Sequence, residues 1–234
     1  MDESASAMPT WLDLYDYRRR VAGLYRARND ALQAGHDAGV VWAQFCAAKD
    51  RLYAEHPQSP LSGAQRAGFA GLAYFPYNPA LCVPAVLEPA PAAEGPVPAL
   101  PASGPQTMPF RRAARLHFTL DQTPCVLVVY WIDVYGGSLF VPFRDTTSGD
   151  ATYGGGRYLV DSVKGSDFIP APAQPSGPAS AAGPLGWAGG PVRLDFNYAY
   201  NPSCAYDPRW ICPLAPPDNR LALPIRAGER WAAP

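Results

Sequence analysis

The sequence predicts a mainly β protein of the α+β class, in which an antiparallel β-barrel or sandwich has N-terminal helices packed on it. Proline accounts for 28 of 234 residues, more than twice the usual share of about 5%, so long uninterrupted helices cannot dominate. Helical periodicity is confined to the N-terminal quarter, and from residue 69 short apolar runs separated by Gly and Pro are typical of strands. The 48% hydrophobic content is enough to fill a core.

Two helices are predicted within residues 1–60, which we interpret as an N-terminal helical segment. Thr10 and Asp13 have the spacing of a capping box, and apolar residues follow at intervals of three and four as far as Gly35. A second helix is expected to begin at Asp37 and to end before Pro57. The arginine run at residues 18–20 is interpreted as a solvated helix face, with an anion-binding site as the alternative.

Residues 61–234 are predicted to form the β domain. Strands are expected at residues 82–87, 111–120, 125–133, 138–144, 157–163, 192–200 and 221–226. The third and fourth strands flank Tyr135-Gly136-Gly137, which predicts a hairpin, and the third is apolar on both faces and therefore expected in the middle of the structure. Pro/Ala-rich stretches at 89–109 and 170–191 are expected to be loops. Periodicity does not record the pairing order, so barrel and sandwich both stay open.

Charge and compartment signals exclude several classes of partner. With 19 basic and 20 acidic residues, the chain lacks the basic excess of a general nucleic-acid or anionic-membrane binder. Its longest apolar run, residues 125–132, is far short of the ~20 residues that span a bilayer, and the N-terminus lacks the plan of a secretory signal. We therefore expect a cytoplasmic protein without a nucleic-acid or membrane partner. The sequence leaves the oligomeric state open.

Cysteine spacing predicts no metal site. The 5 cysteines are scattered and include no CxxC pair, so zinc-ribbon and thioredoxin-like sites are excluded. Cys46 and Cys125 lie in apolar runs and are interpreted as small buried hydrophobes. No pattern identifies a cofactor.

The first candidate site segment is the polar connection at residues 143–158, which contains Arg144, Tyr153 and Arg157. Its three consecutive glycines, residues 154–156, would let backbone N–H groups approach an anionic ligand. The glycines match neither GxGxxG nor a phosphate-binding P-loop, and no helix clearly follows them. A long hairpin loop is the alternative interpretation.

The second candidate segment, residues 195–220, begins at the end of a predicted strand. It is dense in polar side chains, including Asp195, Asn197, Asn201 and Cys204, and rigid sheets often present binding residues in this way. Cys204 and Cys212 are expected to pack in the loop, with a disulfide or a catalytic thiol at Cys204 as alternatives.

Acid–base chemistry has one candidate, Asp195, acting as a general base beside arginines. Asp145 is a second carboxylate near Arg144 and Arg157, and structural ion pairs explain these residues equally well. Histidine occurs only 3 times, and neither GxSxG nor HExxH is present, which disfavours hydrolases of those kinds.

Four stretches of the sequence resemble a prokaryotic family, the domain of unknown function numbered sixteen eighty-four. They are KDRLYAEHPQSPL at 49–61, GLAYFPYNPAL at 71–81, LFVPFRDTTSGDATYGGGRYL at 139–159 and DFNYAYNPSCAYDPRWICPLAPPDNRLALPIRAGER at 195–230. The resemblance implies family membership and a shared site region, but no reaction. It also implies a short form, without the additional β-rich segment that many members carry ahead of the HPQSPL-like stretch.

Three functions stay open at this point. The leading hypothesis is a small-molecule-binding β domain whose polar pocket is formed by residues 143–158 and 195–220. Its predicted ligand-binding residues are Arg144, Tyr153, Arg157, Asp195, Asn197, Asn201 and Cys204. The alternatives are an enzyme that uses an Asp/Arg site centred on Asp195, and a protein-interaction module that uses the proline-rich segments.

Overall fold

The computed structural model describes residues 9–91, 100–105, 108–161, 166, 168–170 and 191–231. Two antiparallel helices, α1 (Trp11–Gln33) and α2 (Ala38–Glu55), come first, followed by the short helix α3 (Gly63–Ala67). The Thr10–Asp13 capping box is present, and the Asp37 side chain accepts a hydrogen bond from the N–H of Val40 at the start of α2. Both predicted helices are confirmed, because local capping signals set where they begin.

The strands form one antiparallel sheet in the order β5-β4-β3-β2-β1-β7-β6. Their bounds are β1 (Cys82–Pro89), β2 (Phe110–Leu120), β3 (Thr123–Ile132), β4 (Leu139–Phe143), β5 (Arg157–Asp161), β6 (Ile169–Pro170) and β7 (Pro191–Asp195). β3 and β4 pair across the Gly136-Gly137 turn, with Gly136 at φ +70°, which confirms the hairpin. β3 lies between β2 and β4, in the middle of the sheet as expected.

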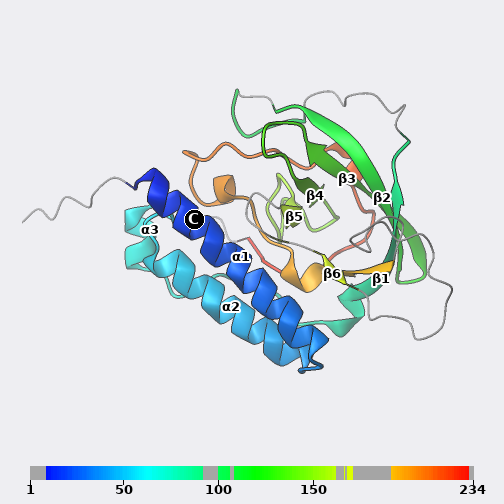
Figure 1. Ribbon diagram of the computed structural model, residues 1–234, viewed down its shortest axis with the longest axis horizontal. Helices are drawn as coiled ribbons and strands as arrows, with labels where there is room; N and C mark the ends of the chain where they lie inside the picture. The colour runs from blue at the N-terminus through cyan, green and yellow to red at the C-terminus, as the bar shows by residue number, and fades with distance from the viewer. Residues whose placement is uncertain are drawn as a thin grey trace, which may run out of the picture.

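The sheet curls into a half-barrel, so the alternative of a sandwich is excluded (Figure 1). Tyr158 on β5 and Tyr200, which follows β7 in the chain, exchange two backbone hydrogen bonds of 2.9 and 3.1 Å. This bridge connects β5, at one edge of the sheet, to the chain that follows β7 near the other edge.

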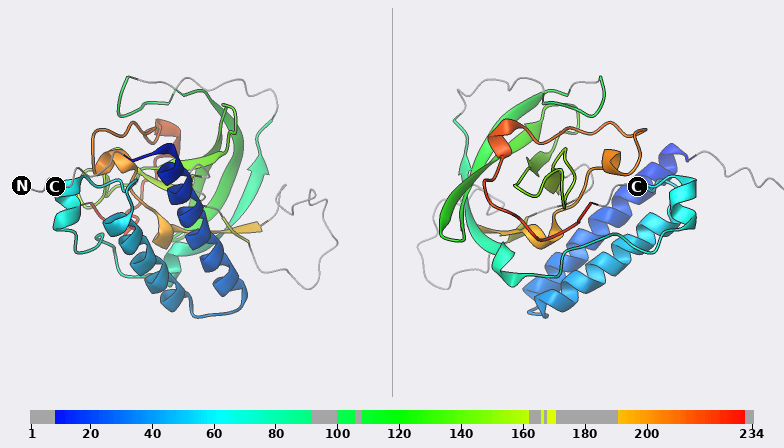
Figure 2. Two further views of the ribbon diagram at one scale, coloured as in Figure 1. Left: turned by 60° about the vertical axis from the view of Figure 1, so that its left-hand side comes forward. Right: turned by 180° about the vertical axis from the view of Figure 1, so that it is seen from behind.

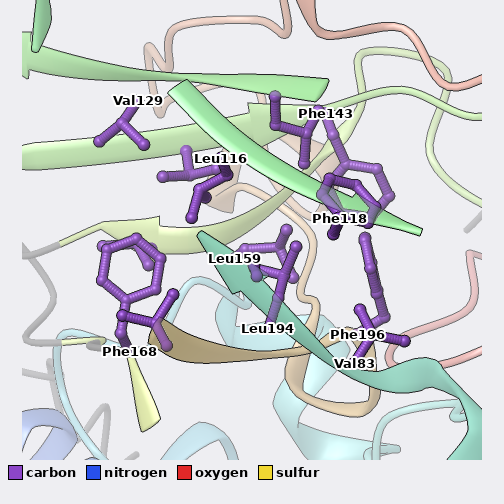
Figure 3. Packing of buried hydrophobic residues seen from close by; sticks show 14 of the residues in the cluster. Val83, Leu116, Phe118, Val129, Phe143, Leu159, Phe168, Leu194 and Phe196 are labelled. Atoms are coloured by element: carbon purple, nitrogen blue, oxygen red, sulfur yellow. The ribbon is translucent and has the colours of Figure 1, made fainter. Parts of the chain in front are cut away.

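Two apolar clusters occupy opposite faces of the sheet. The larger one fills the inside of the curl and includes Leu116, Phe143 and Phe196 (Figure 3). The second lies on the other face of β3–β5 and contains Tyr130, Ile132, Phe140, Tyr158 and Tyr200, among others. Because both faces are covered, β3 and β4 are apolar along nearly their whole length, and β5 is apolar between Arg157 and Asp161.

The helices pack on the half-barrel through a third cluster, which includes Tyr25, Phe45, Ile169 and Tyr198. Figure 2 shows the helix pair lying against one side of the curled sheet. None of the described helices is long and apolar enough to cross a membrane.

Two strand predictions are wrong near the C-terminus. The strand expected at 192–200 ends at Asp195, whose side chain accepts from the Asn197 N–H and starts a 3₁₀ turn over Phe196–Tyr198. Residues 221–226 form no strand, because their backbone groups bond to irregular chain and to side chains: the Leu221 N–H donates to the Arg144 carbonyl at 2.8 Å, and the Ile225 N–H donates to the Asp145 carboxylate at 2.5 Å. The Arg157 guanidinium donates to the Ile225 carbonyl at 2.8 Å, so this segment needs no neighbouring strand.

The predicted loops are described only in part. The stretch at 89–109 includes buried Leu100, and the Ser103 N–H donates to the Cys212 carbonyl at 3.0 Å. Most of the stretch at 170–191 lies outside the described residues.

Candidate functional site

A cavity of about 230 Å³ lies between helix α1, strands β3–β5 and the segment 203–213. In Figure 1 that segment, in orange, runs between α1 and the strands β4 and β5. The described lining is mostly apolar: Leu14, Tyr17, Arg18, Gln58, Pro60, Met108, Ile132, Phe140, Tyr158, Asp161, Ser203, Trp210, Ile211, Cys212 and Pro213. A few polar groups in an apolar pocket are the usual make-up of a small-molecule site.

Hydrogen bonds hold the segment 203–213 in place as a wall of the cavity. The Tyr158 hydroxyl, on β5, donates to the Pro213 carbonyl. The indole N–H of Trp210 donates to the Pro60 carbonyl at 3.2 Å, and the Arg209 guanidinium donates to the Ser59 carbonyl at 2.9 Å. The wall is therefore fixed both to the sheet and to the turn after α2.

The charged groups in the lining are Arg18 and Asp161, which differ in exposure. Arg18 is exposed on α1, whereas Asp161, at the end of β5, is only 6% exposed. Burial raises the pKa of Tyr158 far above its usual value, and the nearby negative charge of Asp161 adds to that shift. The Tyr158 hydroxyl thus stays protonated and acts as a hydrogen-bond donor.

None of the seven predicted ligand-binding residues lines this cavity. The structure brings two of them together, since the Tyr153 hydroxyl lies 3.8 Å from the Cys204 sulfur. Burial is the main cause that raises the pKa of Tyr153 to about 12, with Cys204 contributing. Tyr153 also packs edge-on against Trp231, with 5.9 Å between the ring centres.

Arg157 is fully buried and bonds to the chain near the C-terminus. Its guanidinium donates to the carbonyls of Ile225, Ala227 and Glu229 and lies 3.4 Å from Asp145. Burial lowers the pKa of Arg157 to about 10, and the nearby carboxylates oppose that shift. These contacts fit the predicted structural ion pair.

Arg144 belongs to the same region of the chain. It pairs through its backbone with Asn219 and Leu221, at 2.9 and 2.8 Å.

Asp195 and Asn197 connect the end of β7 to the segment before β1. The Asp195 carboxylate accepts from the backbone and side-chain amides of Asn197, at 2.9 and 2.8 Å. The Asn197 side chain in turn makes two hydrogen bonds of 2.8 Å with the backbone of Asn78. Burial raises the pKa of Asp195.

Asn201 lies in a buried charged network that the sequence did not reveal. The Lys49 ammonium is 2.5 Å from a Glu229 carboxylate oxygen, and the other oxygen accepts from the Asn201 N–H and the Tyr206 hydroxyl, each at 2.7 Å. Lys49 also lies 4.6 Å from the ring centre of Tyr200.

A signal for this network was present within the second helix. Lys49 continues the buried stripe of Val41 and Phe45 at the same four-residue spacing, where an apolar residue is expected. Its partner is 180 residues away in the sequence, so no local pattern identifies Glu229.

The described residues include no group of three or more potential metal ligands. The five cysteines are all described, and none of them forms a disulfide. Cys46 is buried as expected, whereas Cys125 is only partly buried.

Fold and cavity together define an α+β half-barrel protein with a small, mostly apolar cavity under its first helix. The chain matches the model of the family described as "Protein of unknown function (DUF1684)" over residues 67–230. It therefore belongs to this family, as the resemblance implied. The matched region contains the strands and both candidate segments, whereas α1 and α2 precede it.

A solved structure gives the same fold. The chain is similar, at 31% identity and a TM-score of 0.54, to the solution NMR structure of an uncharacterized protein from gene locus rrnAC0354 of Haloarcula marismortui. The similarity covers 80% of this chain and 91% of that protein. No curated protein matches the chain.

Proposed function

We propose that this protein binds a small molecule in the cavity between α1, β3–β5 and the segment 203–213. The observation that carries the proposal is a space of about 230 Å³ with a mostly apolar lining. A cavity of about 150 Å³ holds benzene. The size therefore suits a ligand with one ring and a short substituent.

The lining indicates how such a ligand would be held. Ile132 and Phe140 come from the sheet and offer apolar contact to the body of the ligand, while Arg18 and Ser203 offer polar contact. Both candidate segments contribute to the walls, through Tyr158 from the first and residues 203 and 210–213 from the second. This supports the predicted region, although the seven predicted residues lie elsewhere and their role in binding stays a prediction.

A matched pair of tryptophan substitutions on α1 tests the proposal. Leu14 lines the cavity, whereas Leu12 is 78% exposed and absent from the lining. We expect benzyl alcohol and phenylacetate to bind the native protein in titration calorimetry, because their single ring fits the space. Leu14→Trp should weaken this binding at least tenfold by filling the cavity, and Leu12→Trp should leave it unchanged.

Circular dichroism would establish that both variants are folded. Equal affinities in the native protein and folded Leu14→Trp would contradict binding in this cavity.

The alternative of an enzyme with Asp195 as its base draws support from the raised pKa of that carboxyl group. The space beside Asp195, however, is a void of about 10 Å³, which is too small for a substrate. Ligand binding is therefore the function that the geometry supports best. A cytoplasmic location and a proline-rich interaction surface stay predictions from the sequence.

A further inference from the structure

We propose that the ligand is a small monocarboxylic acid with one apolar ring, and that its carboxylate pairs with Arg18 at α1. This inference rests on the proposed function and names the class of molecule that the cavity selects. Three features carry it: the sign and availability of the Arg18 charge, the position of Asp161, and the size of the space.

Arg18 is the positively charged residue among the described residues that line the cavity. Its two neighbours in the arginine run are engaged elsewhere, since Arg20 lies 2.6 Å from Asp16 and Arg19 lies over the ring of Tyr15. Within the described part of the chain no comparable contact involves Arg18. A planar guanidinium matches a carboxylate through two parallel hydrogen bonds, which makes a carboxylate a favourable small partner for Arg18.

Asp161 determines the orientation of the bound acid and limits the ligand to one carboxylate. The residue is buried in the lining, where a low dielectric strengthens repulsion between like charges. The carboxylate of the ligand is therefore expected to turn away from Asp161 and toward Arg18. A dicarboxylate would place its second charge in the apolar interior or near Asp161, so the cavity should reject it.

The apolar walls of the cavity favour a ligand whose body is an apolar ring. Phe140 and Ile132 are both nearly fully buried and belong to the cluster on the outer face of the sheet. A ring against these side chains removes apolar surface from water at about 25 cal/mol per Å². Phenylacetate combines a single ring with one carboxylate on a short arm and is a suitable probe.

Three probes of nearly equal size separate charge from shape: phenylacetate, the neutral phenylacetamide and the cationic 2-phenylethylamine. We expect calorimetry on the full chain to give an affinity for phenylacetate at least tenfold higher than for the amide. Arg18→Gln should abolish this preference while leaving amide binding in place. Arg19→Gln should retain the preference, because that side chain is on the same helix but absent from the lining.

The outcomes distinguish this inference from the proposed function. Equal binding of all three probes, or tightest binding of the amine, would overturn the inference and leave the cavity as a ligand site. An equal loss in Arg18→Gln and Arg19→Gln would also overturn it, since the general charge of α1 would then be responsible. If none of the probes binds, the proposed function and the inference both fail.

Discussion

Removing the Lys49 charge should destabilise the protein more than removing a charge from an exposed ion pair. Lys49 and Glu229 are 8% and 0% exposed, and their charged atoms are 2.5 Å apart. In Lys49→Met the Glu229 carboxylate keeps its hydrogen bonds from Asn201 and Tyr206 but loses the cation. Leaving one charge of a buried pair unpaired costs about 3–5 kcal/mol.

This loss can be measured as a change in the free energy of unfolding in urea, followed by tryptophan fluorescence. For a chain of this size about 2–4 °C of Tm corresponds to each kcal/mol, so Tm should fall by roughly 6–20 °C. The second variant, Lys49→Met with Glu229→Gln, should recover much of the loss, because the amide is neutral and still accepts a hydrogen bond.

The matched control is Arg111→Met, which removes the ion pair between Arg111 and Asp133. The Arg111 side chain is 55% exposed. Its loss should be far smaller, because water screens the exposed pair. Equal losses in Lys49→Met and Arg111→Met, or no recovery in the double variant, would refute the reasoning that burial makes this pair costly to break.

Three further predictions concern the backbone and the buried carboxylate. Burial raises the pKa of Asp195 above 3.8. The protonated side chain therefore stabilises the fold below pH 3.8, and this stabilisation is lost as the pH rises through the raised pKa. The urea midpoint of Asp195→Asn should fall less than that of the native protein over this pH range. Gly149 and Gly156 have φ of +95° and +96°, but only at Gly156 would a Cβ meet other atoms, at 2.6 Å. An added Cβ strains the backbone equally at both positions, so Gly149→Ala controls for that strain. Gly156→Ala should therefore lower Tm clearly more than Gly149→Ala in paired thermal scans, because only its Cβ also clashes with neighbouring atoms. Asp37→Ala should cost about 1 kcal/mol in urea unfolding, because α2 loses its N-cap.

Most of the fold could be predicted because its signals are local. The caps of α1 and α2 are set by side chains within three residues of the bonded N–H groups, and the β3–β4 hairpin by two adjacent glycines. Strand order could not be predicted. It depends on long-range pairs such as Cys82 with Asp195, and periodicity carries no record of which strands meet.

The cavity is harder to infer because its walls come from separate parts of the chain. Leu14, Phe140 and Trp210 all line it, yet each alone is an ordinary apolar residue of a helix, a strand or a loop. Only their packing leaves the space unfilled. Composition therefore indicates a core and cannot show where the core is incomplete.

Polar density in the two candidate segments has a physical explanation that does not require a ligand. Irregular chain that is buried lacks neighbouring strands, and its backbone groups must be satisfied by side chains instead. Asn219 illustrates this, since its side chain bonds both backbone groups of Val128 and the carbonyl of Pro142. Arg157 and Asn197 serve other segments in the same way. In such a fold, clustered Arg and Asn indicate where irregular backbone is buried, and a ligand is better sought where the walls are apolar and a charge such as Arg18 is left available.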